Sequence, residues 1–527
     1  MRTWPALRAA ACALALAIGA LPRSAVAAPG PPVVFVPLDD RPVTYQLPAM
    51  LGAIAGRRVE MPPHGALGHY LQPGDPDAVL GWLESGVTAG ASAVVASLDM
   101  VAYGGLVASR VPGEPSYLAY GRLRRLAALR APGTRMLAFG TIMRLAPTGV
   151  PRAPQTGAYW ATGDTVDDIA AYANLPWPGL DAEQSAKAER LRAKIGPERL
   201  DAYLGARARN LDVDRFALQL TAERGLDELV LGQDDAGPHG LHVADVAALR
   251  RTAARFGVDE RASIEPGADE LGMVLLARAF ARDAGWRPRV RVVYSRAGAE
   301  SVVDPLEFVP IDETIGKLIG AAGAGRVDSA EDLDLFVRVA DTPAADERAF
   351  VDAIAAALAA GRATAVADLT FLSPPMPSAQ QQALTLDLIA RGLAGRIDGF
   401  ASWNTDANTV GTALAAAVAA GSGRRAGTFD ARAHAQFMLD RYADDFAFHQ
   451  FVRPVLNDEL RARGIDTTLL FPPVVTEAGD ENRTLLWPRA LDLLAQIYPG
   501  YRDAGLVITL PWQRTFETQL DVRLTPP

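Results

Sequence analysis

The sequence predicts an α/β fold with two doubly wound lobes and a helical insertion. Short apolar runs alternate with helical segments along most of the chain, which is typical of parallel sheets covered on both faces. We count about ten such runs, more than a plain eight-stranded barrel needs, and an elaborated TIM-like barrel is the alternative. The 527 residues also exceed the usual span of one hydrophobic core. We therefore predict lobes at residues 29–286 and 287–427, followed by a helical and mixed region at 428–527.

The N-terminus is typical of an export signal. Arg2 and Arg8 give a basic start, residues 9–20 form an apolar run too short to span a bilayer, and residues 24–28 offer small side chains for cleavage. We predict a signal peptide at 1–28 and a periplasmic or extracellular location. The single cysteine, Cys12, lies inside this signal. The mature chain then has no disulfide, thiolate metal site or cysteine nucleophile.

Charge and motifs exclude several classes of protein. The net charge is −9, and it becomes more negative when a signal with three arginines and no acid is removed, so we predict no nucleic-acid partner. No later segment is apolar for long enough to give a stable membrane span after cleavage. No G-x-S-x-G elbow surrounds a serine, no G-x-G-x-x-G follows an early strand, and no P-loop motif occurs. A serine hydrolase and a nucleotide cofactor are therefore not indicated.

The first lobe alternates strands and helices up to residue 286. We expect helices at 45–55, 75–86, 242–256 and 271–284, and strands at 33–38, 58–61, 93–98, 135–142, 228–231 and from 263. Residues 147–220 carry little strand signal but show helical charge patterns. We interpret them as a helical insertion at the strand ends, where elements that cover a substrate usually lie. A subdomain that only completes the core is equally consistent with the pattern.

The second lobe repeats the alternation with four further strands. These are expected at 289–294, 335–339, 364–367 and 399–403, with helices between them such as 345–360. A long helix should follow from residue 431 to beyond Arg453, and a final apolar strand at 505–510. Ligand sites in such folds lie at the carboxyl ends of the parallel strands.

Polar side chains follow most of the predicted strands. The clearest case is the strand at 228–231, which ends in Gly232, Gln233, Asp234 and Asp235, with His239 a few residues later. Adjacent carboxylates at the end of a buried strand are unfavourable unless charged partners neutralise them or a reaction or ligand requires them. Other strands end in a similar way, at Asp39, Asp40 and Arg41, at Asp99, at Asp269 and Glu270, at Asp368, and at Asn404, Thr405 and Asn408.

Paired carboxylates favour hydrolysis of a glycosidic bond. That reaction needs one protonated carboxyl group and one ionised carboxylate across the scissile bond, and neighbouring acids split their pKa values in this way. We predict a hydrolase with a small-molecule or carbohydrate substrate and with Asp234 and Asp235 as its acid/base centre. The second carboxylate would be Asp39, Asp40 or Asp99. The predicted substrate-binding residues are Arg41, Gln233, His239, Asp269, Glu270, Asn404, Thr405 and Asn408.

Three alternatives stay open from the sequence. Oxygen-rich sets of side chains also suit Mg, Mn or Ca, so a metal-dependent phosphoesterase is one of them. No zinc-binding frame surrounds His239 and His242, and no cofactor is predicted. A saccharide- or metal-binding protein without catalysis is the second alternative. The third is an ion-pair network in which Arg41, Arg110 and Arg144 only neutralise the acids.

Several motifs in order resemble those of a bacterial family, domain of unknown function 4127. They are Val36-Pro-Leu-Asp-Asp-Arg-Pro42, Ser97-Leu-Asp-Met-Val-Ala-Tyr-Gly-Gly105, Gly232-Gln-Asp-Asp235, Pro266-Gly-Ala-Asp-Glu270, Trp403-Asn-Thr405 and Leu510-Pro-Trp-Gln-Arg-Thr-Phe-Glu517. The resemblance covers nearly the whole mature chain. It implies no particular activity, so the residue roles above follow from the residues alone.

Overall fold

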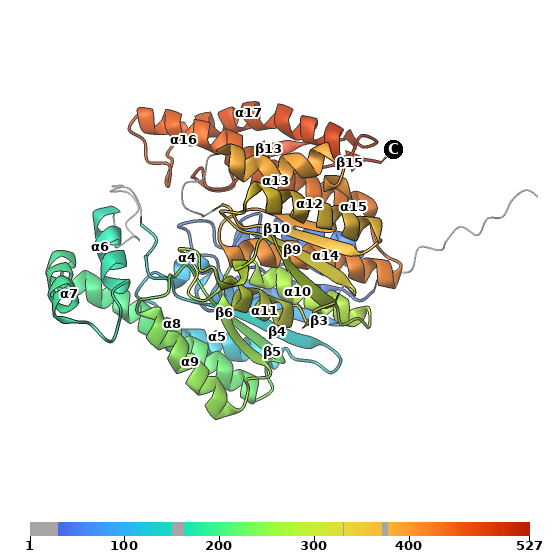
Figure 1. Ribbon diagram of the computed structural model, residues 1–527. Coiled ribbons are helices and arrows are strands. Elements are labelled where there is room, and N and C mark those ends of the chain that lie inside the picture. The colour runs from blue at the N-terminus through green and yellow to red at the C-terminus, as the bar shows by residue number, and fades with distance from the viewer. Residues whose placement is uncertain (1–29, 150–162, 330, 372–377, 527) are drawn as a thin grey trace, which may run out of the picture.

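The computed structural model describes residues 30–149, 163–329, 331–371 and 378–526. It contains two parallel sheets whose strands alternate with helices (Figure 1), which confirms the predicted α/β class. The predicted signal peptide lies outside the described residues, as does the stretch 150–162 of the predicted insertion.

The first sheet has six strands in the order β2-β1-β3-β4-β5-β6, and every neighbouring pair is parallel. Its strands are short and mostly apolar because helices cover both of its faces. The strands are β1 (Val33–Val36), β2 (Val59–Glu60), β3 (Ala93–Ser97), β4 (Arg135–Ile142), β5 (Glu228–Gln233) and β6 (Ala262–Pro266).

The second sheet has five parallel strands in the order β11-β10-β9-β7-β8. In each sheet, the strand that comes first in the sequence lies between the second and the third. The chain therefore extends the sheet first on one side and then on the other, so both sheets are doubly wound. The crevice of such a sheet opens between the first and third strands. The strands are β7 (Arg289–Tyr294), β8 (Gly325–Arg326), β9 (Leu333–Arg338), β10 (Ala363–Asp368) and β11 (Gly399–Ala401).

Three helices pack between the two sheets and join them into one core, and Figure 1 shows two of them, α10 and α14. They are α1 (Gln46–Ala55), α10 (Leu271–Asp283) and α14 (Asp406–Ala426), and α14 packs against both others. One hydrophobic cluster includes Phe35 of the first sheet, Phe280 of α10 and Phe336 of the second sheet. Most of α14 consists of alanine and glycine, so neighbouring elements approach it closely. A Cβ at Gly411 would lie 2.3 Å from Cγ of Glu270.

The outer face of the first sheet packs against a second cluster. Val34 and Val36 of β1 point into this cluster because successive side chains of a strand face opposite ways. The helices that contribute to it are α2 (Pro76–Trp82), α3 (Leu98–Tyr103), α5 (Ser116–Ala128), α8 (Pro197–Ala222) and α9 (His242–Phe256). The first-sheet part also contains three short helical segments, which are η1 (His64–Ala66), η2 (Leu83–Val87) and α4 (Leu106–Ser109).

The helical segments that connect the strands of the second sheet are η3 (Ala299–Ser301), α11 (Ile311–Ala321), α12 (Ala344–Ala359), α13 (Ser378–Ala390) and η4 (Ala394–Arg396).

Between β4 and β5 lies the helical segment that the sequence predicts as an insertion. It contains α6 (Gly163–Ala173), α7 (Ala182–Ile195) and the long helix α8. Helix α8 packs against α5 and α9, so it also serves as the crossover helix of the first sheet. Helices α6 and α7 pack together and project from the body of the protein (Figure 1).

The C-terminal region forms a helical layer with two small antiparallel ribbons. Helices α15 (Ala431–Arg441), η5 (Tyr442–Val452) and α16 (Arg453–Ala462) make one continuous run, as predicted, and α17 (Val474–Ile497) packs against η5. The ribbons pair β12 (Arg502–Asp503) with β15 (Leu524–Thr525), and β13 (Val507–Thr509) with β14 (Gln519–Asp521). Within the described ranges, every helix is too short or too polar to cross a membrane.

Candidate functional site

A polar cavity of about 300 Å³ lies at the carboxyl ends of the strands. Loops that follow β1, β4, β5, β6, β7 and β11 all contribute to it, and so does the segment between β13 and β14. The charged side chains that line this inner cavity are Arg41, Arg110, Arg144, Asp234, Asp235, Asp269, Glu307 and Arg514.

Two glycines allow the end of β5 and the loop after β6 to approach each other. A Cβ at Gly232 would lie 2.1 Å from the carbonyl oxygen of Gly267, a distance that no real side chain tolerates. Gly267 itself has a φ of 110°, which favours glycine. The close approach brings Asp234 and Asp235 to the same cavity as Asp269.

Arg41 is held between two carboxylates. Its Nη2 donates to Asp39 Oδ2 at 2.8 Å and to Asp269 Oδ1 at 2.6 Å, and its Nη1 donates to Asp269 Oδ2 at 2.9 Å. Burial opposes the charge of this guanidinium, but Asp269 and Asp39 keep the pKa of Arg41 above its ordinary value. All three side chains are buried, so the network fixes the loops after β1 and β6 relative to each other.

Two further arginines pair with the adjacent aspartates after β5. Arg110 donates to Asp234 and to Thr148 Oγ1, the latter at 2.8 Å, and Arg144 Nη1 lies 3.0 Å from Asp235 Oδ2. The side chain of Asp234 is 6% exposed, whereas that of Asp235 is 27% exposed. Burial and the charge of Asp234 raise the pKa of Asp235, and Arg144 opposes the shift. Asp235 is therefore the one of the two that a ligand can reach.

Unusual backbone conformations gather at this cavity. Asp235 has a φ of 21° and Asn404 a φ of 51°, both in the region that side chains other than glycine rarely occupy. Both residues line the inner cavity. Such conformations persist where the surrounding structure enforces them, and they are frequent at functional sites.

Two glutamates near the cavity have no arginine partner among the residues that the structure describes. Glu307, in the loop after β7, accepts from the Ala407 amide at 3.0 Å, and its Oε2 has no hydrogen-bond partner within the part of the chain that the structure describes. Burial raises the pKa of Glu307 to about 8, and Asp235 and Asp304 add to this shift. Glu270 accepts from Asn408, and burial raises its pKa to about 8 as well. Both groups hold a proton at neutral pH.

The structure brings most of the predicted residues together. Those that line the inner cavity are Arg41, Gln233, Asp234, Asp235, Asp269, Asn404, Thr405 and Asn408. Asp39 and Glu270 lie directly behind it, bonded to Arg41 and Asn408.

The remaining predicted residues lie elsewhere. Asp40 accepts from His69 Nδ1 at 2.8 Å and from Trp512 Nε1 at 2.6 Å. Asp99 is buried and accepts from the amide and the hydroxyl of Thr141 at 2.9 and 2.8 Å, and burial raises its pKa to about 6. His239 is exposed and is not among the residues that line the cavity.

The sequence did not single out three residues that line the cavity. Glu307 lies between Leu306 and Phe308 in the sequence, and it lines the cavity. An acidic residue between two apolar neighbours was the sequence signal that could have pointed to it. Trp512 and Arg514 follow the apolar run at 505–510, so they occupy a predicted strand end. Trp512 stacks on Tyr70 and has the guanidinium groups of Arg41 and Arg514 over its ring.

An outer cavity of about 680 Å³ adjoins the inner one. Both are lined by Arg144, Thr148, Asp235, Leu306 and Arg514, so these residues lie where the two spaces meet. Polar groups from the C-terminal region and the helical segment also face the outer cavity, among them Asp167, Asn174, Asp466 and Thr468. The site can therefore hold a ligand that extends beyond the inner cavity.

Comparison with known proteins gives a family without an assigned activity. The family model described as Protein of unknown function (DUF4127) matches residues 33–521. The chain belongs to this family. Neither a curated protein nor a solved structure matches it.

The inner cavity is lined by both hydrogen-bond donors and hydrogen-bond acceptors. Guanidinium groups only donate and ionised carboxylates only accept, whereas a hydroxyl group does both. A ligand with several hydroxyl groups can therefore bond to the pairs Arg41–Asp269 and Arg144–Asp235 at once. In the described ranges of the chain, no three acidic, histidine or cysteine side chains are grouped so as to hold a metal ion.

Proposed function

We propose that this DUF4127 protein is an exported hydrolase that cleaves a glycosidic bond. The observation that carries the proposal is the pair Glu307 and Asp235, which line one cavity in unlike surroundings. Within the described ranges Glu307 has no cationic partner, and its pKa is about 8, whereas Asp235 lies against Arg144. A protonated acid and an ionised carboxylate are the two groups that glycoside hydrolysis requires.

Each carboxyl group has a separate task in this reaction. Glu307 protonates the oxygen of the leaving group, and the bond from that oxygen to the sugar breaks. Asp235 acts on the opposite side, either by removing a proton from water or by attacking the sugar carbon. Asp234, paired with Arg110 and buried, acts as a positioning residue that raises the pKa of Asp235. This differs from the sequence prediction, in which Asp234 and Asp235 together formed the acid/base centre.

The surrounding residues suit a carbohydrate. Asp269 and Arg41 offer acceptors and donors for sugar hydroxyl groups, and the side-chain amides of Asn404 and Gln233 can do both. Trp512 has Tyr70 stacked on its ring and two guanidinium groups over it, so we assign it to holding the arginines and not to stacking on a sugar. The outer cavity gives room for a further part of the substrate.

The proposal can be tested on the mature chain with a panel of saccharides and divalent ions. The first measurement is the unfolding temperature, because a ligand at about 100 times its dissociation constant adds roughly 2.7 kcal/mol to the stability. The saccharides that raise it are then assayed for turnover by the parent, by Asp235→Asn and by Asp201→Asn. Asp201 is an exposed residue of α8 and serves as the matched control.

We expect a saccharide that stabilises all three proteins and is hydrolysed by the parent and by Asp201→Asn only. Binding without turnover by the parent would contradict hydrolysis and favour a saccharide-binding protein. Stabilisation by Mg, Mn or Ca alone, lost in Asp234→Asn, would overturn the proposal in favour of a metal-dependent phosphoesterase. Turnover by Asp235→Asn at the parent rate would remove that residue from the mechanism.

A further inference from the structure

The candidate site consists of two connected cavities of unequal size. The inner cavity measures about 300 Å³, at the lower end of the range of small-molecule sites, and the outer cavity about 680 Å³. Asp235 and Glu307 both line the inner cavity. The shape of this cavity therefore decides which part of a saccharide reaches the two acids.

The inner cavity opens into the outer one. Most of the residues that line the inner cavity are buried. Apart from Asn404 and Phe516, the partly exposed ones all line the outer cavity as well. They are Arg144, Thr148, Asp235, Leu306 and Arg514. The exposed side of the inner cavity is therefore the side that faces the outer cavity.

The rear of the inner cavity is closed by Arg41 and Phe516. Arg41 is 6% exposed and is held in place by its ion pairs with Asp39 and Asp269. The space behind Arg41 and Phe516 has a volume of only about 20 Å³. That is room for about one water molecule and not for a sugar. A saccharide chain cannot pass between the described residues at this point.

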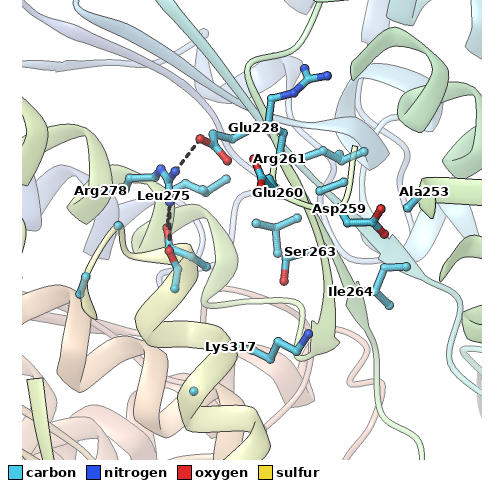
Figure 2. A pocket seen from close by; sticks show the side chains of 18 of the residues that line it. Glu228, Ala253, Asp259, Glu260, Arg261, Ser263, Ile264, Leu275, Arg278 and Lys317 are labelled. Atoms are coloured by element: carbon cyan, nitrogen blue, oxygen red, sulfur yellow. Dashed lines mark hydrogen bonds and ion pairs between the residues drawn. The ribbon is translucent and has the colours of Figure 1, made fainter. Parts of the chain in front are cut away.

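The inner cavity also does not continue through the first sheet. A depression of about 840 Å³ lies at the opposite end of that sheet (Figure 2), beside the first residues of β5 and β6. Its lining includes Glu228 and Arg278, which are bonded to each other, and no residue that also lines the inner cavity. In the part of the chain that the structure describes, the inner cavity is thus a dead end that is entered from the outer cavity.

The polar side chains of this dead end suit a single sugar. Arg41, Gln233 and Asn404 come from the ends of β1, β5 and β11, so they belong to both sheets. A sugar ring has hydroxyl groups on several sides, and each hydroxyl group both donates and accepts. One ring can therefore bond to all three side chains, and the small volume leaves the next sugar of a chain to the outer cavity.

We propose that the protein is exo-acting and removes one sugar at a time from the non-reducing end of a saccharide. This inference rests on the proposed hydrolysis and names the class of substrate. The inner cavity holds the terminal sugar, and the outer cavity holds the rest of the chain. A bond in the interior of a chain does not reach the acids, because sugars on both sides of it would need a cavity open at both ends.

The end that is cleaved follows from the positions of the two acids. Asp235 lines both cavities, and Glu307 follows Leu306, which also lines both, so the reacting bond lies at the junction. The bond between the anomeric carbon of the enclosed sugar and the linking oxygen breaks. This oxygen takes the proton of Glu307 and leaves with the chain in the outer cavity. The hydroxyl group of a water molecule adds to the anomeric carbon, and the other proton of that water replaces the one that Glu307 gave. A terminal sugar that is linked through its anomeric carbon is the non-reducing end.

Binding and product analysis on the mature chain test this inference. The binding probes are free hexoses, deoxyhexoses, N-acetylhexosamines and uronic acids, and the readout is the unfolding temperature. The substrates are tetrasaccharide alditols of the same sugars, whose reduced end marks the end that is not cleaved. Thr468→Trp narrows the outer cavity alone. Val303→Trp is the matched control, because Val303 is exposed and lines neither cavity.

We expect one of the free monosaccharides to raise the unfolding temperature of the parent and of both variants, since neither substitution touches the inner cavity. The first products from the tetrasaccharide alditol should be that monosaccharide and the trisaccharide alditol. In Thr468→Trp the KM for the alditol should rise about tenfold, as expected when a sugar in the outer cavity loses its hydrogen bonds. Val303→Trp should keep the KM of the parent.

The other outcomes separate this inference from the proposed hydrolysis. Disaccharides as first products, or alditols that are cleaved while no monosaccharide binds, would overturn cleavage from the end and leave hydrolysis in place. A monosaccharide that binds without turnover of any alditol would overturn hydrolysis and leave a pocket for a terminal sugar. An equal rise of KM in Val303→Trp would overturn the role of the outer cavity. Absence of any shift and of any turnover would overturn both proposals.

Discussion

The two sheets have the same winding order, and both end in charged residues, yet those residues have different surroundings. At the end of the second sheet, Arg338 Nη1 lies 3.1 Å from Asp368 Oδ2, and both side chains are 1% exposed. Asp368 also accepts from Thr370, and Arg338 donates to backbone carbonyls. At the end of the first sheet, Arg144 and Asp235 are paired but about a quarter exposed, and they line a cavity.

The difference shows that an acid at a strand end is not in itself a sign of function. Arg338 is enclosed by Asp368, Glu347 and backbone carbonyls, and a buried ion pair of this kind gives a ligand little access. At the end of the first sheet Asp235 is open to the cavity, and Glu307, from the loop after β7 of the second sheet, adds an oxygen that has no hydrogen-bond partner among the described residues. Substitutions at the two strand ends should therefore act on different properties, on turnover at one and on stability at the other.

The largest expected effect is on turnover, from Glu307→Gln. Glutamine retains the acceptor for the Ala407 amide but has no acidic proton to transfer, so kcat should fall by about 10²- to 10⁴-fold, the usual contribution of a general acid. The loss should be smaller for aryl glycosides, because a nitrophenolate leaves without protonation. The control is Glu347→Gln, which removes a partner of Arg338 at the second sheet and should leave kcat unchanged. Equal turnover of all three proteins would contradict the role of Glu307.

The second effect is on stability, from Asp368→Asn. The substitution leaves the buried guanidinium of Arg338 without its main charge partner, and such changes cost about 3–5 kcal/mol of unfolding free energy. Urea denaturation measures the loss. Asp352→Asn is the control, because its ion pair with Arg391 is exposed and should contribute less than about 1 kcal/mol. If the two variants have similar urea midpoints, the buried ion pair does not contribute more to stability than the exposed one, and the prediction is wrong.

The third prediction concerns pH. Glu307 acts as an acid only while protonated, and its pKa is about 8, so kcat/KM should fall above about pH 8 as this proton is lost. The decline approaches about tenfold per pH unit for a single essential acid. In Glu307→Gln the decline should be absent, because no proton is titrated at that position. A parent profile that stays flat from pH 7 to 10 would contradict the assignment.

The smallest effect should follow Asp99→Asn. The sequence placed Asp99 among the candidate second carboxylates, but its side chain is bonded to Thr141 and is not among those that line the cavity. We expect stability to fall by about 1–3 kcal/mol, the range for a disturbed buried hydrogen bond, with turnover within about threefold of the parent. A large loss of kcat at unchanged stability would return Asp99 to the reaction.

The sequence by itself determined the class of fold and those site residues that directly follow a strand. Alternating apolar runs indicated parallel sheets, and the rule that ligands bind at the carboxyl ends of strands pointed to Asp234 and Asp235. The loops after β6 and β11 were found in the same way, at Asp269 and Asn404. These predictions depend on residues next to one another in the chain, where local periodicity and strand ends can be recognised.

Tertiary structure alone decided which of these residues meet. The sequence shows no internal repeat, yet both sheets have one winding order, and α14 holds them so that loops from both reach one cavity. Glu307 and Arg514 enter the site from distant parts of the chain, and the same packing buries Asp99 and leaves His239 exposed. The pKa of Glu307 follows from this packing, because burial without a cationic partner is a property of the assembled fold and not of the residue.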